Sequence, residues 1–169
     1  MSPPVTGIDH LIVGVRDLDA AQRAWARLGF TVTPRGRHRG WGTANRCIML
    51  QEGYVELLGI VDPTKFDNGL AAFLQQQEGL LGIALGTSDA AVTHAAWRRA
   101  GLAPREPAAL GRLLELPEGD VELKFRNTML ERQELAGVGL FASQRAAIDD
   151  ETAPIFARIN AARGGVDGA

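Results

Sequence analysis

GIDHLIVGVRD, from Gly7 to Asp17, decides the fold, because the chain contains a second version of this stretch. One constant shift places it on GLLGIALGTSD, from Gly79 to Asp89, and the same shift brings Trp25 onto Trp97. Each copy reads as an apolar run of strand length, an aspartate, a helical stretch with a tryptophan, and then a glycine. The sequence therefore predicts a strand followed by a helix, written twice in the same order.

The helix in each copy has recognisable ends. Asp17 and Asp89 are candidate N-caps, because an aspartate side chain can accept hydrogen bonds from the free amides of a first helical turn. Gly29 and Gly101 suit the left-handed position just past a helix end. Between these signals, apolar residues recur every three or four positions on one face of the first helix (Leu18, Ala21, Trp25 and Leu28).

Two related octapeptides predict hairpins. LQEGYVEL (Leu50–Leu57) and LPEGDVEL (Leu116–Leu123) agree at six of eight positions, so Glu122 repeats Glu56. Besides the apolar run of the first copy, the expected strands are Phe30–Thr33, Ala44–Gln51, Tyr54–Ile60, Ile83–Thr87, Arg112–Leu116 and Val121–Arg126, with a weak one near Ala103–Arg105 and a further one over Val138–Ser143. A helix is expected near residues 69–77. We therefore predict an α+β fold with two βαβββ modules, over residues 7–60 and 79–127, in one domain of residues 1–169 with a C-terminal extension over 128–169.

Length, composition and net charge exclude some classes of function. The chain has 169 residues, 46% of them hydrophobic, and a formal charge of −2, which predicts no general attraction to nucleic acid. No apolar run approaches the roughly 20 residues that a membrane span requires. Cys47 is the single cysteine, and the first residues lack the pattern of a signal peptide. We expect a soluble, cytoplasmic protein with no nucleic-acid or membrane partner.

The doubled order of strand, helix and three strands, with His10 in the first strand and Glu56 in the fourth, resembles the vicinal oxygen chelate superfamily. It is most similar to the glyoxalase-like domains of that superfamily. GIDHLIVGVRDLDAA, RGRHRGWGTANR and YVELLGI look like the three hallmark stretches of these domains. The resemblance implies that each module curls a mixed sheet into an open half-barrel, that a small-molecule ligand lies in the shared cleft, and that the protein is a homodimer.

The same resemblance implies a divalent metal in the cleft. His10, Glu56 and Glu122 are the candidate ligands, and one nitrogen with two carboxylates suits Zn, Mn, Fe, Ni or Co. Gly82 stands where His10 would be repeated and offers no ligand atom, and Arg145 stands near where relatives carry a histidine. Glu122 has a second interpretation, in which it pairs with Lys124 on a solvated strand.

The segment PRGRHRGWGTANR is present in the first module and has no counterpart in the second. Guanidinium groups bind carboxylates or phosphates in a two-pronged geometry, so Arg37 and Arg46 are candidates for substrate binding, together with Trp41 and Asn45. His38 is a candidate acid–base group, because its ordinary pKa is about 6.5. The alternative is a solvated basic loop without a ligand.

Two functions follow. The first is a metal-dependent lyase, isomerase or dioxygenase that acts on a small acidic or carbonyl-containing substrate, with Glu56 or His38 moving the proton. The second is a metal-free binder of small molecules, similar to the drug-sequestering members of the superfamily. In the second case Gly82, Ala84 and Gly86 make room for a bulky compound.

Overall fold

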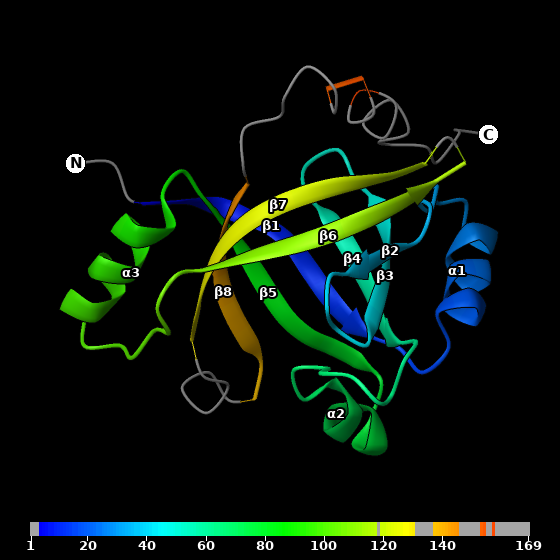
Figure 1. Ribbon diagram of the computed structural model, residues 1–169, viewed down its shortest axis with the longest axis horizontal. Helices are drawn as coiled ribbons and strands as arrows, with labels where there is room; N and C mark the ends of the chain where they lie inside the picture. The colour runs from blue at the N-terminus through cyan, green and yellow to red at the C-terminus, as the bar shows by residue number, and fades with distance from the viewer. Residues whose placement is uncertain (1–3, 118, 131–136, 146–152, 155–156, 158–169) are drawn as a thin grey trace.

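The computed structural model describes residues 4–117, 119–130, 137–145, 153–154 and 157, so most of the predicted C-terminal extension lies outside the described residues. Single helices separate groups of strands along this part of the chain (Figure 1). They are β1 (Val5–Gly14), α1 (Leu18–Arg27), β2 (Gly36–His38), β3 (Thr43–Met49), β4 (Tyr54–Ile60), α2 (Leu70–Gln76), β5 (Gly79–Thr87), α3 (Ala90–Arg99), β6 (Ala108–Leu116), β7 (Gly119–Leu130) and β8 (Gly139–Arg145). None of the described helices is long and apolar enough to cross a bilayer.

The strands form one mixed sheet that closes into a barrel in the order β1-β4-β3-β2-β6-β7-β8-β5. The sequence predicted an open sheet. The sheet closes because β1 pairs antiparallel with β5 and β2 pairs antiparallel with β6, which joins the two halves along both of their edges. Figure 1 shows the helices outside the barrel, with α1 and α3 on opposite sides and α2 near one end.

The parallel strand pairs show which positions correspond between the halves. β1 pairs with β4, and Ile12 lies opposite Glu56. β5 pairs with β8 in the same parallel manner, and Ala84 lies opposite Phe141. The counterpart of β4 is therefore β8, and the counterpart of Glu56 is Phe141. Glu122 lies on β7, which is antiparallel to both of its neighbours.

The two octapeptides therefore form hairpins at different places in the strand order. The first makes the turn between β3 and β4, and the second makes the turn between β6 and β7. Their common Glu-Gly turn and alternating pattern specify a hairpin, and neither feature specifies which strands the hairpin joins. β7 continues to Leu130 and β8 follows at Gly139–Arg145, beyond the predicted end of the second module at residue 127.

One predicted strand is displaced. Phe30–Thr33 contributes only an isolated bridge between Val32 and Ile48, and the strand β2 forms at Gly36–His38, inside the segment predicted to be a loop. Pro34 follows the bridge and has no backbone N–H to continue a ladder. Two antiparallel neighbours, β3 and β6, hold β2 in place although its Arg and Gly content is poor for a strand.

The helix caps and the apolar face of α1 agree with the prediction from the sequence. Asp17 caps α1 by accepting hydrogen bonds from the amides of Asp19 and Ala20, and Asp89 caps α3 in the same way. α1 covers the outer face of β3 and β4 with a cluster that includes Leu18, Trp25, Ile48, Val55 and Leu57. Leu70 and Leu74 of α2 pack against Leu81, Ile12 and Leu58 near one end of the barrel. The opposite face of β1 and β4 is left to the interior.

The turn between β3 and β4 yields the first prediction. Gly53 has a φ of 76°, and a Cβ atom there would lie 2.6 Å from the carbonyl oxygen of Asp9. Gly40 has the same φ of 76° with nothing within 4 Å of its Cβ position. We expect Gly53→Ala to lower the free energy of unfolding by about 2–4 kcal/mol and Gly40→Ala by about 1 kcal/mol, because only the first adds a clash to the backbone strain. Urea unfolding of both variants measures this, and equal losses would contradict the close approach to Asp9.

Candidate functional site

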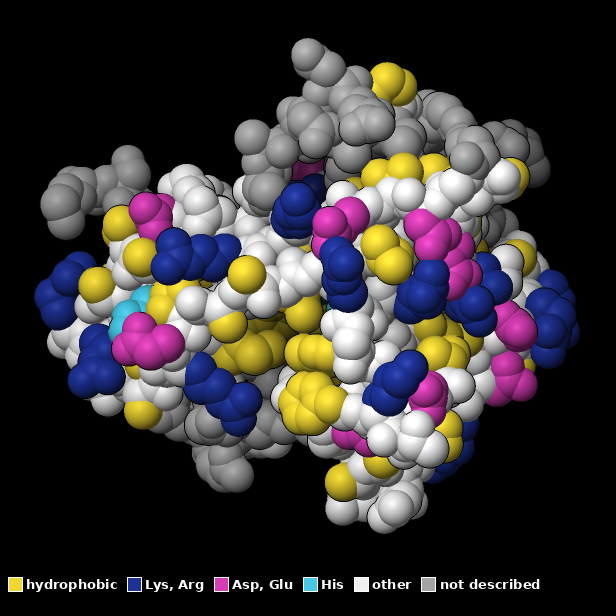
Figure 2. Space-filling model, viewed as in Figure 1, with side chains coloured by type: hydrophobic (Ala, Val, Ile, Leu, Met, Phe, Trp, Pro, Cys, Tyr) yellow, Lys and Arg dark blue, Asp and Glu magenta, His cyan; other side chains and the backbone are white. Residues whose placement is uncertain are grey.

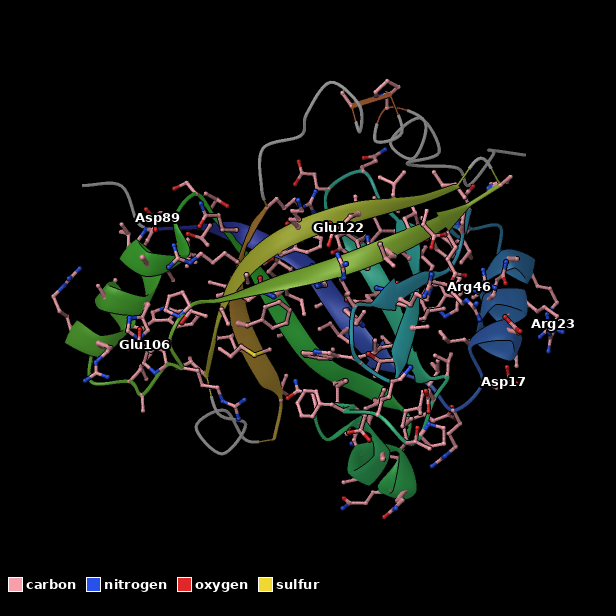
Figure 3. All side chains as sticks on the ribbon, in the orientation of Figure 1. Asp17, Arg23, Arg46, Asp89, Glu106 and Glu122 are labelled. Atoms are coloured by element: carbon pink, nitrogen blue, oxygen red, sulfur yellow. The ribbon has the colours of Figure 1, made fainter. Side chains whose placement is uncertain are left out.

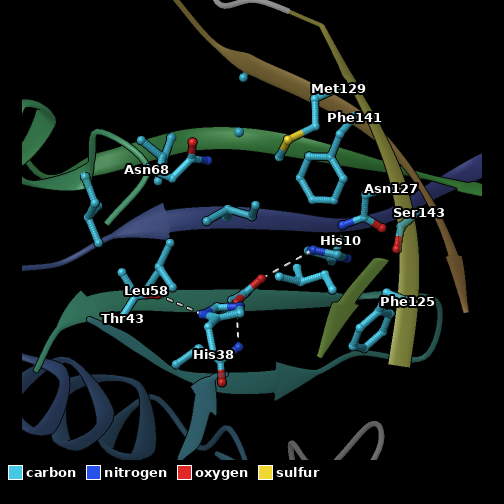
Figure 4. A pocket seen from close by; sticks show the side chains of 18 of the residues that line it. His10, His38, Thr43, Leu58, Asn68, Phe125, Asn127, Met129, Phe141 and Ser143 are labelled. Carbon is cyan, nitrogen blue, oxygen red and sulfur yellow. Dashed lines mark hydrogen bonds and ion pairs between the residues drawn. The ribbon is translucent and has the colours of Figure 1, made fainter. Parts of the chain in front are cut away.

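The barrel encloses a cavity of about 300 Å³. Figure 2 shows a hollow on one face of the molecule, with hydrophobic side chains on its floor and rim. At one end of the cavity the lining is polar and comes mainly from β1, β2, β3, β4 and β6 (His10, His38, Asn45, Glu56 and Arg112). Across from them, β7 and β8 supply most of the apolar wall (Phe125, Met129, Leu130, Leu140 and Phe141), as Figure 4 shows in part.

His10 and Glu56 face each other in this cavity and are each only 6% exposed. His10 Nε2 lies 3.4 Å from Glu56 Oε2, and the side-chain amide of Asn45 donates a hydrogen bond to Glu56 Oε1. The His10 ring stacks on Tyr54 with a centroid distance of 4.3 Å. Parallel pairing of β1 with β4 brings these groups together, because it places the two strands side by side with both side chains inward.

A β-bulge supplies His10 with a second carboxylate. The register of β1 against β5 shifts between Ile8 and His10, which leaves Asp9 as an extra residue. Its Oδ1 lies 2.6 Å from His10 Nδ1, and its two oxygens accept hydrogen bonds from Arg145 Nη2 at 3.0 and 2.9 Å. The imidazole is thus held at both nitrogens by carboxylates.

The contacts between Asp9, His10 and Glu56 determine the protonation states of His10 and Glu56. Burial alone lowers the pKa of His10, but the hydrogen bonds and charges of Asp9 and Glu56 outweigh it, so the pKa lies above its ordinary value. Burial alone raises the pKa of Glu56, but the hydrogen bond and charge of His10, with the charges of His38 and Arg112, bring the pKa down to about 2. Below the pKa of His10, the interior therefore holds an imidazolium between two carboxylates.

His38 lies on the other side of Glu56 and behaves differently. Its Nδ1 is 2.9 Å from Thr43 Oγ1, and both residues are labelled in Figure 4. Its Nε2 is 3.9 Å from Glu56 Oε1, and its ring contacts Trp41. Burial lowers the pKa of His38, and the positive charge of Arg112 lowers it further, more than Glu56 raises it. Two histidines therefore flank one carboxylate, one favouring the charged form and the other the neutral form.

The residues predicted to bind a substrate divide into two groups. Trp41 and Asn45 line the cavity. Arg37 lies outside it and pairs with Glu115 and Asp120, each at 2.6 Å. Arg46 also lies outside the cavity and pairs with Asp19 of α1 at 3.0 Å, next to the helix in Figure 3. Acidic side chains of neighbouring elements therefore bind the guanidinium groups that the sequence analysis assigned to a ligand.

Glu122, the third predicted metal ligand, lies away from the other two. It accepts a hydrogen bond from Arg39 at 2.9 Å and lies 3.8 Å from Lys124, in agreement with its alternative interpretation, and Figure 3 shows it on β7. Within the described parts of the chain, no group of three or more His, Cys, Asp and Glu side chains is arranged to hold a metal ion. The counterparts of His10 and Glu56 in the second half are Gly82 and Phe141, which have no donor atom. The donor set does not fit a resident metal.

Arg112 and Asp9 were not predicted from the sequence to belong to the site. Arg112 lies on β6 opposite His38 and lines the cavity. No motif marks it, because its inward position depends on the register between β2 and β6, two strands far apart in the sequence. Asp9 stands next to His10, so simple alternation places it on the opposite face, and only the bulge brings its carboxylate to the imidazole.

Comparison with known proteins identifies the family. The model of the glyoxalase-like domain matches residues 8–162, and the chain belongs to this family, within the vicinal oxygen chelate superfamily as its sequence predicted. No curated protein matches the sequence.

Solved structures support the same fold. A methylmalonyl-CoA epimerase from Mycobacterium tuberculosis is 19% identical, with a TM-score of 0.68 over 87% of this chain and 93% of that one. A variant of a methylmalonyl-CoA epimerase from Streptomyces coelicolor, in complex with 2-nitronate-propionyl-CoA, is 25% identical, with a TM-score of 0.63 over 85% of this chain and 99% of that one. A hypothetical protein from Staphylococcus aureus is 18% identical, with a TM-score of 0.70 over 89% of this chain and 63% of that one.

The charges of His10 and Glu56 predict how stability depends on pH. The low pKa of Glu56 stabilises the fold above its ordinary value of 4.5, and this stabilisation is lost as the pH falls toward about 2. The raised pKa of His10 stabilises the fold below its ordinary value of 6.5, and this stabilisation is lost as the pH rises through the pKa in the folded protein. The contribution of the pair to the free energy of unfolding should therefore be largest between pH 4.5 and 6.5.

Urea unfolding of Glu56→Gln between about pH 3 and pH 8 tests that prediction. The variant should lose about 3–5 kcal/mol of unfolding free energy near pH 6, because it leaves His10 without one of its two carboxylates, and the loss should shrink toward pH 3. Glu52→Gln, in the exposed turn before β4, is the control and should follow the wild-type curve. A loss in Glu56→Gln that stays constant with pH would contradict the assigned charges.

Proposed function

We propose that the chain binds a small, largely apolar molecule with one polar end inside the barrel cavity, without a resident metal ion. The observation that supports this most directly is the unequal lining of the cavity. His10 and Glu56 in the first half correspond to Gly82 and Phe141 in the second. A molecule in the cavity therefore meets the ion pair on the side of β1 and β4, and mainly hydrocarbon, with Asn127 and Ser143 among it, on the side of β7 and β8.

The volume of the cavity limits the ligand to a small one. About 300 Å³ is at the lower end of the range for small-molecule sites, and enclosure within a barrel allows most of a ligand's surface to be buried. Polar groups in such a site fix the orientation of the ligand, and the apolar wall provides most of the free energy of binding.

The apolar wall has one property that suits ligands of varied shape. Met129, Leu140 and Phe141 come from two adjacent strands and contribute flexible or flat side chains to one surface.

The test uses metal-depleted protein and three small probes, namely indole, 4-ethylphenol and cyclohexanone. Leu110→Trp fills the cavity from β6, and Leu113→Trp places the same side chain on the outer face of the same strand as the control. At least one probe should bind to the metal-depleted wild type and to Leu113→Trp, in ligand-observed NMR and as a rise in melting temperature. Leu110→Trp should lose this binding, because the indole ring occupies the volume of the ligand.

Binding that appears only after Zn²⁺, Mn²⁺, Fe²⁺, Ni²⁺ or Co²⁺ is added back would contradict the proposed function. Equal binding by Leu110→Trp and Leu113→Trp would show that the probes bind elsewhere.

The two histidines support a second candidate function, in which the cavity catalyses proton transfer next to a carbonyl group as an isomerase or lyase. Groups near one another whose pKa values shift in opposite directions mark an acid and a base. Neutral His38 can accept a proton from carbon, and the positive charge of protonated His10 can stabilise the negative charge that develops on the neighbouring oxygen. Glu56, with a pKa of about 2, is too weak a base near neutral pH, and its role in this scheme is to stabilise protonated His10.

Hydrogen–deuterium exchange measures this activity. Methylmalonyl-CoA, from which the structurally similar epimerases take their name, is incubated with the protein in D₂O. The loss of its α-proton signal is followed by NMR. His38→Asn should slow the exchange by about 100-fold or more, because it removes the base. His94→Asn, on α3 outside the cavity, is the matched control and should exchange at the wild-type rate. An undiminished rate in His38→Asn would eliminate that residue as the base.

A further inference from the structure

We propose that Arg112 is the anion-binding group of the cavity and that the ligand carries a carboxylate as its polar end. This inference rests on the proposed function and names the chemical class of the ligand.

The fold directs Arg112 into the cavity. It lies on β6 opposite His38 of β2, and opposed residues of paired strands point to the same side of the sheet. Leu110, two residues earlier, lines the cavity as well. Gly36 leaves space for Asn45 and for the arginine, because a Cβ atom at that position would clash with Asn45 Oδ1 and lie 3.2 Å from Arg112 Cδ.

Arg112 differs from the other arginines discussed above in its hydrogen-bond partners. Arg37, Arg46 and Arg145 each pair with a carboxylate within 3.0 Å. Arg112 has no ion pair with any described residue. Its Nη1 donates to Cys47 Sγ at 3.3 Å, a weak acceptor, and its Nε is buried without a hydrogen-bond partner among the described residues. A buried guanidinium without an anionic partner is costly, and a ligand carboxylate removes that cost.

Glu56 acts on Arg112 through its charge alone and accepts no hydrogen bond from it. Its Oε2 faces His10, and its Oε1 accepts the hydrogen bond from Asn45. The positive charges of protonated His10 and Arg145 balance the negative charges of Asp9 and Glu56. Arg112 adds one further positive charge to this group, so the polar end of the cavity favours an anion.

A carboxylate suits this site better than a larger anion. Its two oxygens match the two-pronged geometry of a guanidinium, and the cavity of about 300 Å³ leaves room for a small aliphatic or aromatic body against Phe125 and Phe141. His38 lies next to Arg112 and can donate to the same group through Nε2 when that nitrogen carries the proton. The ligand class is therefore a small monocarboxylic acid with an apolar body.

The experiment compares two probes of almost the same shape, phenylacetate and phenylacetamide, by isothermal titration calorimetry at pH 7. The wild type should bind the acid at least about tenfold more tightly than the amide, because only the acid is charged. This comparison needs no variant, so it tests the inference even if a substitution at residue 112 disturbs folding.

Variants assign the preference to one side chain. Arg112→Gln should bind acid and amide with equal Kd, and the Kd for the amide should stay near its wild-type value. Arg112→Lys keeps the charge without the planar geometry and should retain a preference of a few-fold. Arg37→Gln is the matched control on the outside of the barrel and should keep the full wild-type preference.

The outcomes separate this inference from the proposed function. Equal binding of acid and amide by the wild type overturns the inference and leaves the apolar cavity as a binding site. A preference for the acid that persists in Arg112→Gln also overturns it, because another group then binds the anion. If neither of these probes nor any of the three neutral probes binds, the proposed function fails and the inference fails with it.

Discussion

The ion pair between His10 and Glu56 is the interaction on which the interior of the barrel depends. A carboxylate with so little exposure needs a partner of opposite charge, and the parallel pairing of β1 with β4 supplies one. Asp9 contacts the other nitrogen of the imidazole and favours its charged form, and the positive charge of Arg145 balances the negative charge of Asp9. Each charge in this series compensates for the burial of its neighbour, so the polar end of the cavity forms one electrostatic unit.

The second half of the barrel pairs its strands in the same way but has no counterpart of this ion pair. Gly82 and Phe141 occupy the corresponding positions, and an apolar wall of β7 and β8 side chains takes the place of the ion pair. The two ends of the cavity therefore differ in chemistry although the strands around them are paired alike. This difference is the observation behind the proposed ligand, which has a polar end and an apolar body.

Much of the fold was predictable because it is specified locally. The aspartate caps, the apolar helix face and the alternation that turns His10 and Glu56 away from α1 can all be read within short windows of sequence. The position of β2, the pairing of β8 with β5 and the inward position of Arg112 depend on contacts between distant strands. A bulge of one residue cannot be read from alternation either, and it brings Asp9 to His10. The arginines of the segment PRGRHRGWGTANR were predicted to bind a substrate for the same reason. The carboxylates with which Arg37 and Arg46 pair lie on β6, β7 and α1, and short windows of sequence do not show these contacts.

Closure of the barrel also bears on how the protein can associate with itself. Each of the eight strands has a hydrogen-bonded neighbour on both sides within the described part of the chain, so no complete strand edge is offered to a second molecule. The homodimer expected from the family resemblance stays a prediction. If it forms, its contacts are made by side chains on the outer faces of helices and strands, and they do not extend the sheet from one subunit into the next. The same closure protects the strands of the folded protein against fibril-like stacking through their edges.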